Sequence, residues 1–357
     1  SSINISELGW TKDKTTSGQL TIIGSFGQQL NLDNLAFQAP GLEAVGTFEF
    51  DKKNRLQRAR LSKLNIGNWL KTSAVVTPHG DGHTEILLNG GKADLRYFDR
   101  ASSLKGGHSS NISIKLNLSR VRVNNDLSFT AVTGQLFTKG GLNGTFVGRV
   151  NGSTPIEVQL FPLKYGTAIE LISQDAGGVM ASAKLLTNAR EGALRIVLVP
   201  RKDDAYYDGI LEIQRIRFKD ASALADLLNR ISLVGALQQL EGEGIHFSNI
   251  EGQFKLYKSG VKLEKISAVG PSLGITLDGS YNTDTKDVNF EGVITPFYAV
   301  NGAFERIFGE LVGRRKGEGI FGFTYQMRGL ASAPDVVVAP LSILTPGAFR
   351  EIFRQKP

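Results

Sequence analysis

The sequence contains no cysteine, which excludes disulfides, zinc ribbons, iron–sulfur clusters and thiol catalysis. Proline is scarce, with 11 residues in 357, so the chain is neither collagen-like nor a proline-rich low-complexity segment. No apolar run approaches the about 20 residues that a membrane-spanning helix needs. There is no signal peptide and no initial methionine, so we expect a fragment or a mature region whose targeting segment lies outside this chain.

Glycine is the residue in excess, with 41 of 357 against a usual share of about 7%. Together with the shortage of proline, this excess suits many turns and bulges between strands. Hydrophobic residues make up 41% of the chain and charged residues 21%, which is typical of a folded globular protein. The formal net charge of +7 is compatible with binding to nucleic acid, to an anionic membrane surface, or to neither.

Alternation of apolar and polar residues is the commonest pattern in the chain, and it indicates strands with one apolar face. The clearest example contains Ile112, Ile114, Leu116 and Leu118, separated by polar residues. The phase slips by one residue before Val121, which predicts a bulge or a tight turn. Stretches of this kind predict roughly 16 to 20 strands. No βαβ rhythm is present, so we expect a mainly β fold with an antiparallel sheet.

The strongest helical periodicity lies between residues 221 and 240. Its apolar positions follow the spacing of one helix face and are Leu224, Leu227, Leu228, Ile231 and Val234. Asp220 is the expected N-cap, and Gly242 and Gly244 are expected to end the helix. The pattern predicts one amphipathic helix over about 221–240.

Two further segments have helical periodicity, at 304–311 and at about 346–354. The second of these begins after Thr345 as the expected N-cap, with Pro346 at its first position. It carries Phe349, Ile352 and Phe353 on one side and Arg350 and Arg354 on the other. This arrangement suits contact with an anionic membrane surface, and packing on the end of the sheet is equally compatible with it.

The chain also contains a weak internal repeat. Segments 30–61 and 260–294 both have the pattern of a strand, a proline-containing turn, a second strand, a polar turn and a third strand. Segment 136–160 is a looser copy. The repeat predicts a sheet that is extended by repetition. The alternative is that any antiparallel meander resembles itself.

Sequences that resemble catalytic or metal-binding motifs occur in the chain, but each lacks the structural context that its motif needs. His79 and His83 lie in HGDGH, whose glycines and preceding proline favour a hairpin loop over a metal-binding helix. The GPSLG sequence at 270–274 resembles a nucleophile elbow, but no histidine follows Ser272. The GEGIFG sequence at 317–322 lacks the strand and helix of a dinucleotide site. We expect no enzyme activity, catalytic residue, metal or cofactor.

The basic clusters and the apolar sheet face are each a candidate binding surface, the first for nucleic acid and the second for an apolar ligand. The basic clusters at 52–60 and 314–316 are not interleaved with aromatics, as a nucleic-acid site would require, so we expect no nucleic acid partner. The apolar face of a long sheet must be covered, and three helices cover only part of it. Either a second sheet covers the rest, or the sheet curls around an apolar ligand. Phenylalanine, which carries no polar group, accounts for 20 of the aromatic residues and suits both.

The C-terminal part of the chain, about residues 205–357, resembles the C-terminal region of bacterial envelope proteins of the AsmA-like superfamily, of the YhdP and TamB type. The resemblance is carried by the leucine-rich helix, by L-x-G-x-G-I-x-F at 240–247, by P-x-Y-x-V-N at 296–301 and by PLSILTPGAFREIF at 340–353. The first 200 residues are similar only in style. We therefore divide the chain into a repeated β-meander at 1–204 and an AsmA-like part at 205–357, joined as one continuous sheet.

The resemblance implies an elongated, curled antiparallel sheet, a repeating β-groove or half-open barrel, with two or three short helices. It implies a periplasmic protein that an N-terminal helix, absent from this chain, anchors in the inner membrane. The implied role is non-enzymatic: the protein conducts or regulates phospholipid movement between the inner and outer membranes. The alternative is an envelope scaffold or assembly protein that binds protein partners through its sheet edges.

A lipid-transfer role implies candidate residues of two kinds: residues that line or gate the groove, and residues that contact a membrane. Acyl chains would lie along apolar rows that contain Ile112, Ile114, Leu116, Leu118, Phe321 and Phe323. The helix residues Leu224, Leu227, Leu228, Ile231 and Val234 would plug or gate the groove, or fill its end as ordinary core. The candidates for membrane contact are Phe349, Arg350, Ile352, Phe353 and Arg354.

Overall fold

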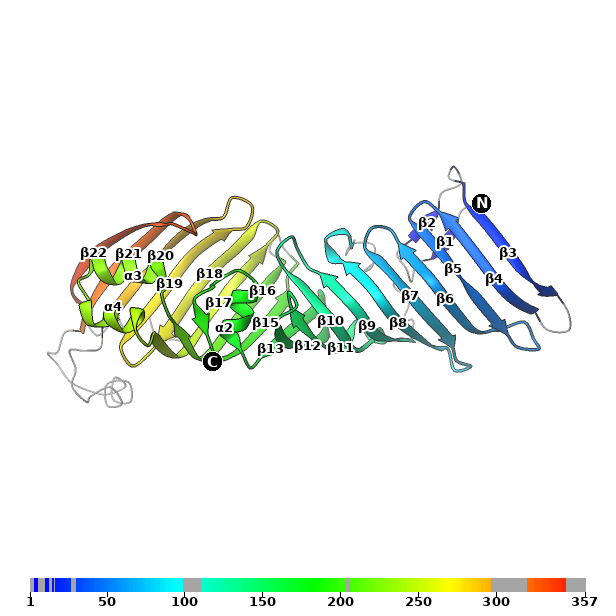
Figure 1. Ribbon diagram of the computed structural model, residues 1–357, viewed down its shortest axis with the longest axis horizontal. Helices are drawn as coiled ribbons and strands as arrows, with labels where there is room; N and C mark the ends of the chain where they lie inside the picture. Colours follow the sequence, from blue (N-terminus) through cyan, green and yellow to red (C-terminus); the bar gives the residue numbers. More distant parts are fainter. Residues whose placement is uncertain are drawn as a thin grey trace. The chain divides into compact units, whose positions relative to one another are not determined.

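A computed structural model describes most of the chain, and it is dominated by strands (Figure 1). The residues that it describes are 3–5, 10–12, 15, 17–26, 30–98, 111–202, 206–296 and 320–344. The fold is mainly β, with a curled antiparallel sheet of 20 strands that stays open, and with short helices. The fold class predicted from the sequence is therefore confirmed.

The chain divides into two compact units, Ser1–Ile169 and Glu170–Pro357. Their boundary lies inside β13 (Gly166–Ser173). The sequence division near residue 204 rests on the family resemblance and stays a prediction.

Unit 1 contains the strands β1 to β12. Their bounds are β1 (Ile3–Ile5), β2 (Trp10–Lys12), β3 (Gln19–Phe26), β4 (Leu30–Ala39), β5 (Leu42–Phe50), β6 (Leu56–Ile66), β7 (Leu70–Pro78), β8 (His83–Asp94), β9 (Asn111–Arg122), β10 (Ser128–Phe137), β11 (Asn143–Val150) and β12 (Thr154–Leu163). β1 and β2 form a separate two-stranded sheet. From β3 onward, each strand pairs with the next in chain order.

One pair in unit 1 departs from the antiparallel pattern. β8 and β9 pair in parallel, with Leu88 opposite Leu116. A parallel pair needs a crossover connection, because the chain must return to the end at which the first strand began. The short helix η2 (Leu95–Tyr97) starts this connection directly after β8. The sequence pattern did not predict the parallel pair.

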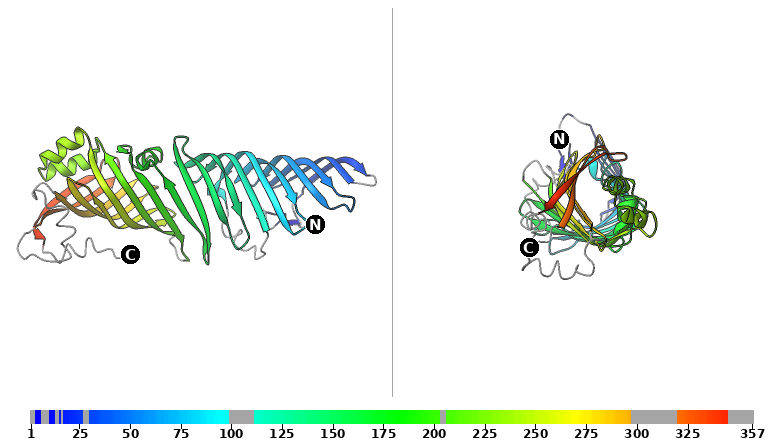
Figure 2. Two further views of the ribbon diagram at one scale, coloured as in Figure 1. Left: turned by 90° about the horizontal axis from the view of Figure 1, so that it is seen from below. Right: turned by 90° about the vertical axis from the view of Figure 1, so that its left-hand side faces the viewer.

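Unit 2 contains the remaining strands and the three α-helices of the described residues. The strands after β13 are β14 (Ala189–Arg190), β15 (Ala193–Pro200), β16 (Tyr207–Phe218), β17 (Ile245–Tyr257), β18 (Gly260–Val269), β19 (Leu273–Asn282), β20 (Asp287–Pro296), β21 (Ile320–Leu330) and β22 (Asp335–Leu344). β15 to β22 pair antiparallel in chain order. Figure 2 shows these strands curving around a common axis.

The segment predicted as one helix forms two, α3 (Ser222–Arg230) and α4 (Val234–Glu241). Ser232 has a φ of 57°, a left-handed conformation that a right-handed helix cannot continue through. Asp220 is not the N-cap: it has a φ of 53°, and Ala221 occupies the cap position without a side-chain hydrogen bond. The third helix, α2 (Ala176–Ser182), was not predicted from its glycine-containing sequence. No helix among the described residues is long and apolar enough to span a membrane.

Glycine permits the tight curl of the sheet at specific positions. A Cβ atom on Gly46 of β5 would lie 2.1 Å from the carbonyl oxygen of Arg60 on β6. A Cβ atom on Gly134 of β10 would lie 2.3 Å from the carbonyl oxygen of Thr145 on β11. Real Cβ atoms do not approach so closely, so the neighbouring strand can come this near only to glycine.

Candidate apolar groove

The alternation predicted for β9 places its apolar residues on one face of unit 1. Leu118 is buried, and Ile112, Ile114 and Leu116 are half-buried. Because residues paired across neighbouring strands point to the same side of a sheet, the pairing partners of these residues define that face over the whole unit. We call it the inner face of unit 1.

The row through Leu116 crosses ten strands, β3 to β12, without a polar residue. In strand order its members are Ile22, Leu35, Gly46, Leu61, Ala74, Leu88, Leu116, Gly134, Phe146 and Val158. At about 4.8 Å between strands, the nine steps correspond to about 43 Å along the sheet. This is longer than half of a bilayer's hydrocarbon core, about 15 Å, which one acyl chain spans.

The row through Ile114 is apolar over the same ten strands. Its members are Gly24, Leu32, Phe48, Ala59, Val76, Ile86, Ile114, Leu136, Gly144 and Leu160. Ala59 and Leu160 are buried, whereas Phe48 and Ile86 are half-buried. Two parallel rows of this length make a continuous apolar strip rather than a closed pocket.

A third row, parallel to the first two, forms one edge of the inner face and is packed more tightly. We call it the end row. It contains Ala39, Leu42, Ile66, Leu70, Ala93, Val121, Phe129 and Val150. Leu42, Ile66, Leu70 and Ala93 join Leu118 in the buried core cluster of unit 1. Leu88, Leu116 and Phe146 pack against that cluster and remain partly exposed. The inner face therefore consists of a buried core cluster and, beside it, a half-exposed apolar strip.

Unit 2 repeats this arrangement over eight strands, β15 to β22. The row through the predicted lining residue Phe323 contains Leu194, Ile213, Ile250, Ala268, Ile275, Ile294, Phe323 and Pro340. A second row contains Leu198, Gly209, Phe254, Leu263, Gly279, Phe290, Met327 and Val336. Ile294 is fully buried, whereas Phe254, Phe290 and Met327 are half-buried. Burial thus decreases from the first row to the second.

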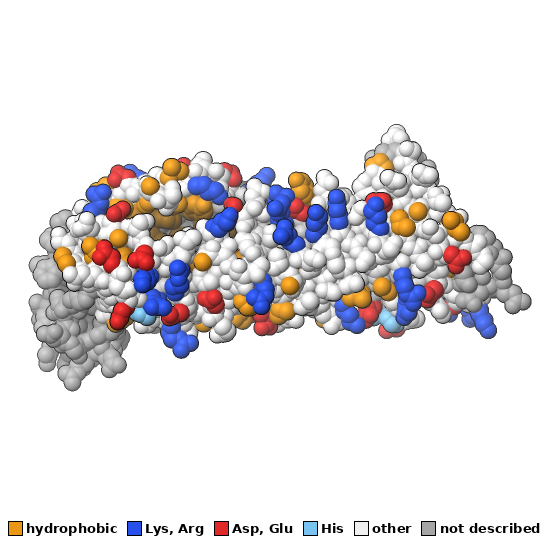
Figure 3. All heavy atoms as spheres, in the orientation of Figure 1, with side chains coloured by type: hydrophobic (Ala, Val, Ile, Leu, Met, Phe, Trp, Pro, Cys, Tyr) orange, Lys and Arg blue, Asp and Glu red, His pale blue; other side chains and the backbone are white. Residues whose placement is uncertain are grey.

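The helices α3 and α4 pack against the sheet of unit 2. α3 contacts β22 and α4 contacts β17, and Figure 1 shows the pair in front of the strands labelled β19 to β22. Leu227, Leu228 and Ile231 are buried, as expected of residues that face the sheet. Leu224 is half-buried, but Val234 is 60% exposed and lies away from the others. Figure 3 shows hydrophobic side chains in a recess beside the helices.

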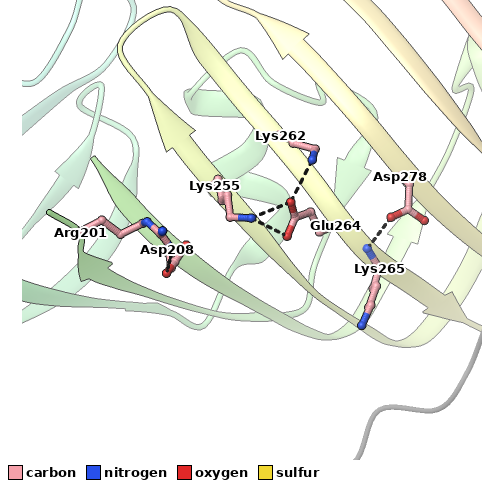
Figure 4. A network of polar contacts seen from close by, with 7 residues as sticks. All are labelled: Arg201, Asp208, Lys255, Lys262, Glu264, Lys265 and Asp278. Atoms are coloured by element: carbon pink, nitrogen blue, oxygen red, sulfur yellow. Dashed lines mark hydrogen bonds and ion pairs between the residues drawn. The ribbon is translucent and has the colours of Figure 1, made fainter. Parts of the chain in front are cut away.

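The opposite face of unit 2 carries charges that are paired. The Nζ atom of Lys255 lies 3.0 Å from Oε1 of Glu264, and that of Lys262 lies 3.2 Å from the same oxygen (Figure 4). The hydrogen bond from Lys255 lowers the pKa of Glu264 and raises that of Lys255. A face of solvated ion pairs opposite an apolar face is what a groove wall requires.

The positions singled out and rejected as catalytic have structural roles. The Ser272 hydroxyl donates a 2.6 Å hydrogen bond to Oε1 of Gln239, which ties α4 to the turn before β19. His79 and His83 stack at 5.5 Å at the β7–β8 turn, and Nε2 of His83 lies 3.1 Å from the Ser113 hydroxyl. Among the described residues, no three His, Asp or Glu side chains are grouped closely enough to hold a metal ion.

Several predicted positions lie outside what the structure describes. The helix at 304–311 and the terminal helix at about 346–354 fall in undescribed segments, and for Phe321 only the backbone is described. The terminal segment contains the membrane-contact candidates Phe349, Arg350, Ile352, Phe353 and Arg354.

Comparisons with known proteins add no relative. No protein-family model matches the chain, and neither a curated protein nor a solved structure is significantly similar to it. The geometry of the apolar rows is therefore what a functional proposal must rest on.

Proposed function

We propose that the chain is a non-enzymatic lipid-transfer protein of the Gram-negative envelope, which conducts or regulates phospholipid movement between the inner and outer membranes. One observation carries the proposal: the inner face of unit 1 has apolar rows that cross ten strands without a polar residue, and part of this face stays exposed. The apolar rows of unit 2 support it in the same way. The resemblance of residues 205–357 to AsmA-like proteins agrees with this role.

The energetics of such a strip favour conduction over tight binding. Burying one CH₂ group contributes about 0.8 kcal/mol, so an acyl chain of about 16 carbons gains on the order of 10 kcal/mol when it leaves water for the strip. A chain that leaves a bilayer for the strip exchanges one apolar environment for another and gains almost nothing. The strip is thus a path of low free energy between two membranes, with the head group kept at its open side.

The test of this proposal is the lipid content of the protein. We expect an organic extract of the chain, expressed in bacteria and purified without detergent, to contain about one or more phospholipids per chain by mass spectrometry, because the half-exposed strip is longer than one acyl chain. An extract without phospholipid from a folded, monodisperse sample would contradict the proposal.

A specific feature favours a second candidate function, a scaffold that binds protein partners by strand addition. β3 pairs only with β4 among the described residues, and its sequence QLTIIGSF has neither a charge nor a proline to block further pairing. Leu20, Ile22 and Ile23 on this strand are all exposed. An empty organic extract together with a protein partner that cross-links to β3 would favour the scaffold.

A further inference from the structure

The outer face of unit 1 carries a row of cations that oppose one another. Lys71 of β7 pairs with Lys92 of β8, and Lys92 pairs with Arg120 of β9. Arg149 of β11 continues the row after Thr130. All four cations are exposed, and Figure 3 shows Lys and Arg side chains following one another along this part of the surface. We call these four residues the basic row.

In the described part of the chain, the basic row has no close ion pair, unlike the other charged rows. Within the described residues, no ion pair includes Lys71, Lys92 or Arg120. Glu43, two strands from Lys71 in the same row, is bound by Lys63 and Asn65, and the charge of Lys71 is a smaller contribution to the lowered pKa of Glu43. Like charges directly opposite each other destabilise a sheet, and an anionic partner would remove that cost. A shallow hollow lined by Lys71, Lys92 and Arg120 marks where such a partner would lie.

Exposed apolar side chains lie at the same edge as the basic row. Leu95, Tyr97 and Phe98, in the turn directly after β8, are 41%, 57% and 36% exposed. The guanidinium of Arg96 lies 5.3 Å from the centroid of the Tyr97 ring. The Phe98 ring packs edge-on against Trp69, which holds the turn in place. Aromatic residues next to cations are typical of protein segments at the interface between membrane and water.

We propose that this edge of unit 1 docks on the surface of a bilayer that contains anionic phospholipid, with the basic row on the phosphates and the turn Leu95–Phe98 in the interface. The proposal rests on the proposed function for its choice of lipid as partner. A nucleic acid is disfavoured because its bases stack on aromatics that alternate with the cations, whereas the pairing and chain neighbours of the basic row are Ser119, Thr130 and Asn65 and the aromatics lie together in the turn beyond it.

The position of the basic row explains what docking would achieve. Lys71, Lys92 and Arg120 are the chain neighbours of Leu70, Ala93 and Val121, which form the end row of the inner face. Neighbouring residues of a strand point to opposite faces, so the cations and the apolar end row share one rim of the sheet. The basic row runs parallel to the apolar rows, so a bilayer held by the cations would lie along the side of the apolar strip that the buried end row borders.

The experiment measures binding to vesicles of equal parts phosphatidylcholine and phosphatidylglycerol, and to vesicles of phosphatidylcholine alone. Wild type is expected to bind the anionic vesicles and to be released by salt. The variant K71Q/K92Q/R120Q should lose about 100-fold in partition, since each cation near an anionic surface contributes about fivefold. The control K52Q/K139Q/K164Q removes the same charge from exposed turns at the opposite strand ends and should bind like wild type.

A second variant tests the turn independently of charge. L95S/Y97S should weaken binding to the anionic vesicles severalfold while leaving the salt dependence intact. The proposal is overturned if wild type does not bind anionic vesicles or if the basic-row variant binds them like the control. It is also overturned if an oligonucleotide fully displaces the vesicles from the basic row. If wild type does not bind the vesicles but its organic extract contains phospholipid, only the docking proposal fails. If wild type binds the vesicles but its extract is empty, the proposed lipid groove fails.

Discussion

The hydroxyl of Tyr325 on β21 donates a 2.7 Å hydrogen bond to the carbonyl oxygen of Thr276 on β19, across the intervening strand β20. The bond is possible because Gly292 lies between them: a Cβ atom there would be 2.9 Å from the Tyr325 hydroxyl. Burial of the ring raises the pKa of Tyr325, so the hydroxyl stays a donor at all physiological pH values. A glycine, a tyrosine and a backbone carbonyl on three neighbouring strands thus tie unit 2 together at this point.

Removing this hydroxyl should destabilise the protein. Tyr325→Phe leaves the Thr276 carbonyl without that donor, and we expect a loss of about 1 kcal/mol in the free energy of unfolding, measured in urea. Tyr257→Phe is the control, because the Tyr257 hydroxyl makes no hydrogen bond among the described residues. Equal stabilities of the two variants would show that the Tyr325 bond contributes nothing.

A charge on the inner face should reduce the amount of phospholipid bound to the strip, whereas the same charge on the outer face should not. Phe146 and Val147 are neighbours on β11: Phe146 belongs to the Leu116 row, and Val147 points outward and is 49% exposed. We expect Phe146→Asp to reduce copurified phospholipid severalfold, because a carboxylate beside acyl chains loses its hydration. Val147→Asp should retain the wild-type content. Circular dichroism checks that both fold.

Glycine on the inner face should be irreplaceable where strands approach closely. Gly134→Val places a side chain against the Thr145 carbonyl and the Cα atom of Phe146, which lies 2.5 Å from the added Cβ. We expect a loss of about 1–3 kcal/mol in the free energy of unfolding, the usual cost of overpacking. Gly80→Ala is the control, since nothing lies within 4 Å of its Cβ position. A stable Gly134→Val protein would contradict the close strand approach.

Acid should weaken the ion pairs on the outer face of unit 2. The pKa of Glu264 is lowered, chiefly by its hydrogen bond with Lys255, from an unfolded value near 4.5. The stabilisation is therefore present above pH 4.5 and is lost as the pH falls through the lower folded pKa. Glu264→Gln should reduce the difference between stabilities at pH 7 and pH 3, measured by urea unfolding. An unchanged difference would mean that the pair contributes no pH dependence.

The period of apolar residues was enough to predict the fold class and parts of the apolar rows of both units. Regular alternation in 112–118 identified one strand of the apolar rows, and alternation in 321–327 placed Phe323 in another. Each is a long strand with one polar face, where the pattern is strongest. The predicted helix face was also informative, since Leu227, Leu228 and Ile231 are buried together.

Other members of the rows gave no readable pattern. Leu88 on β8 is flanked by Leu87, which points outward, so the alternation is lost there. Gly134 and Gly46 contribute to the rows through close approach of the backbone, which no hydrophobicity pattern records. The parallel pair β8–β9 and the opposed cations Lys92 and Arg120 depend on strand register, which only the three-dimensional structure shows.

Site-specific photo-crosslinking in bacteria shows whether lipid lies along the inner face of unit 1. Leu116 and Asn117 are neighbours on β9 that point to opposite faces, and each is replaced in turn by benzoylphenylalanine. We expect the residue at position 116, in the apolar strip, to cross-link to phospholipid, and the residue at position 117 not to. Equal labelling at both positions, or labelling at 117 alone, would contradict a lipid path along the inner face.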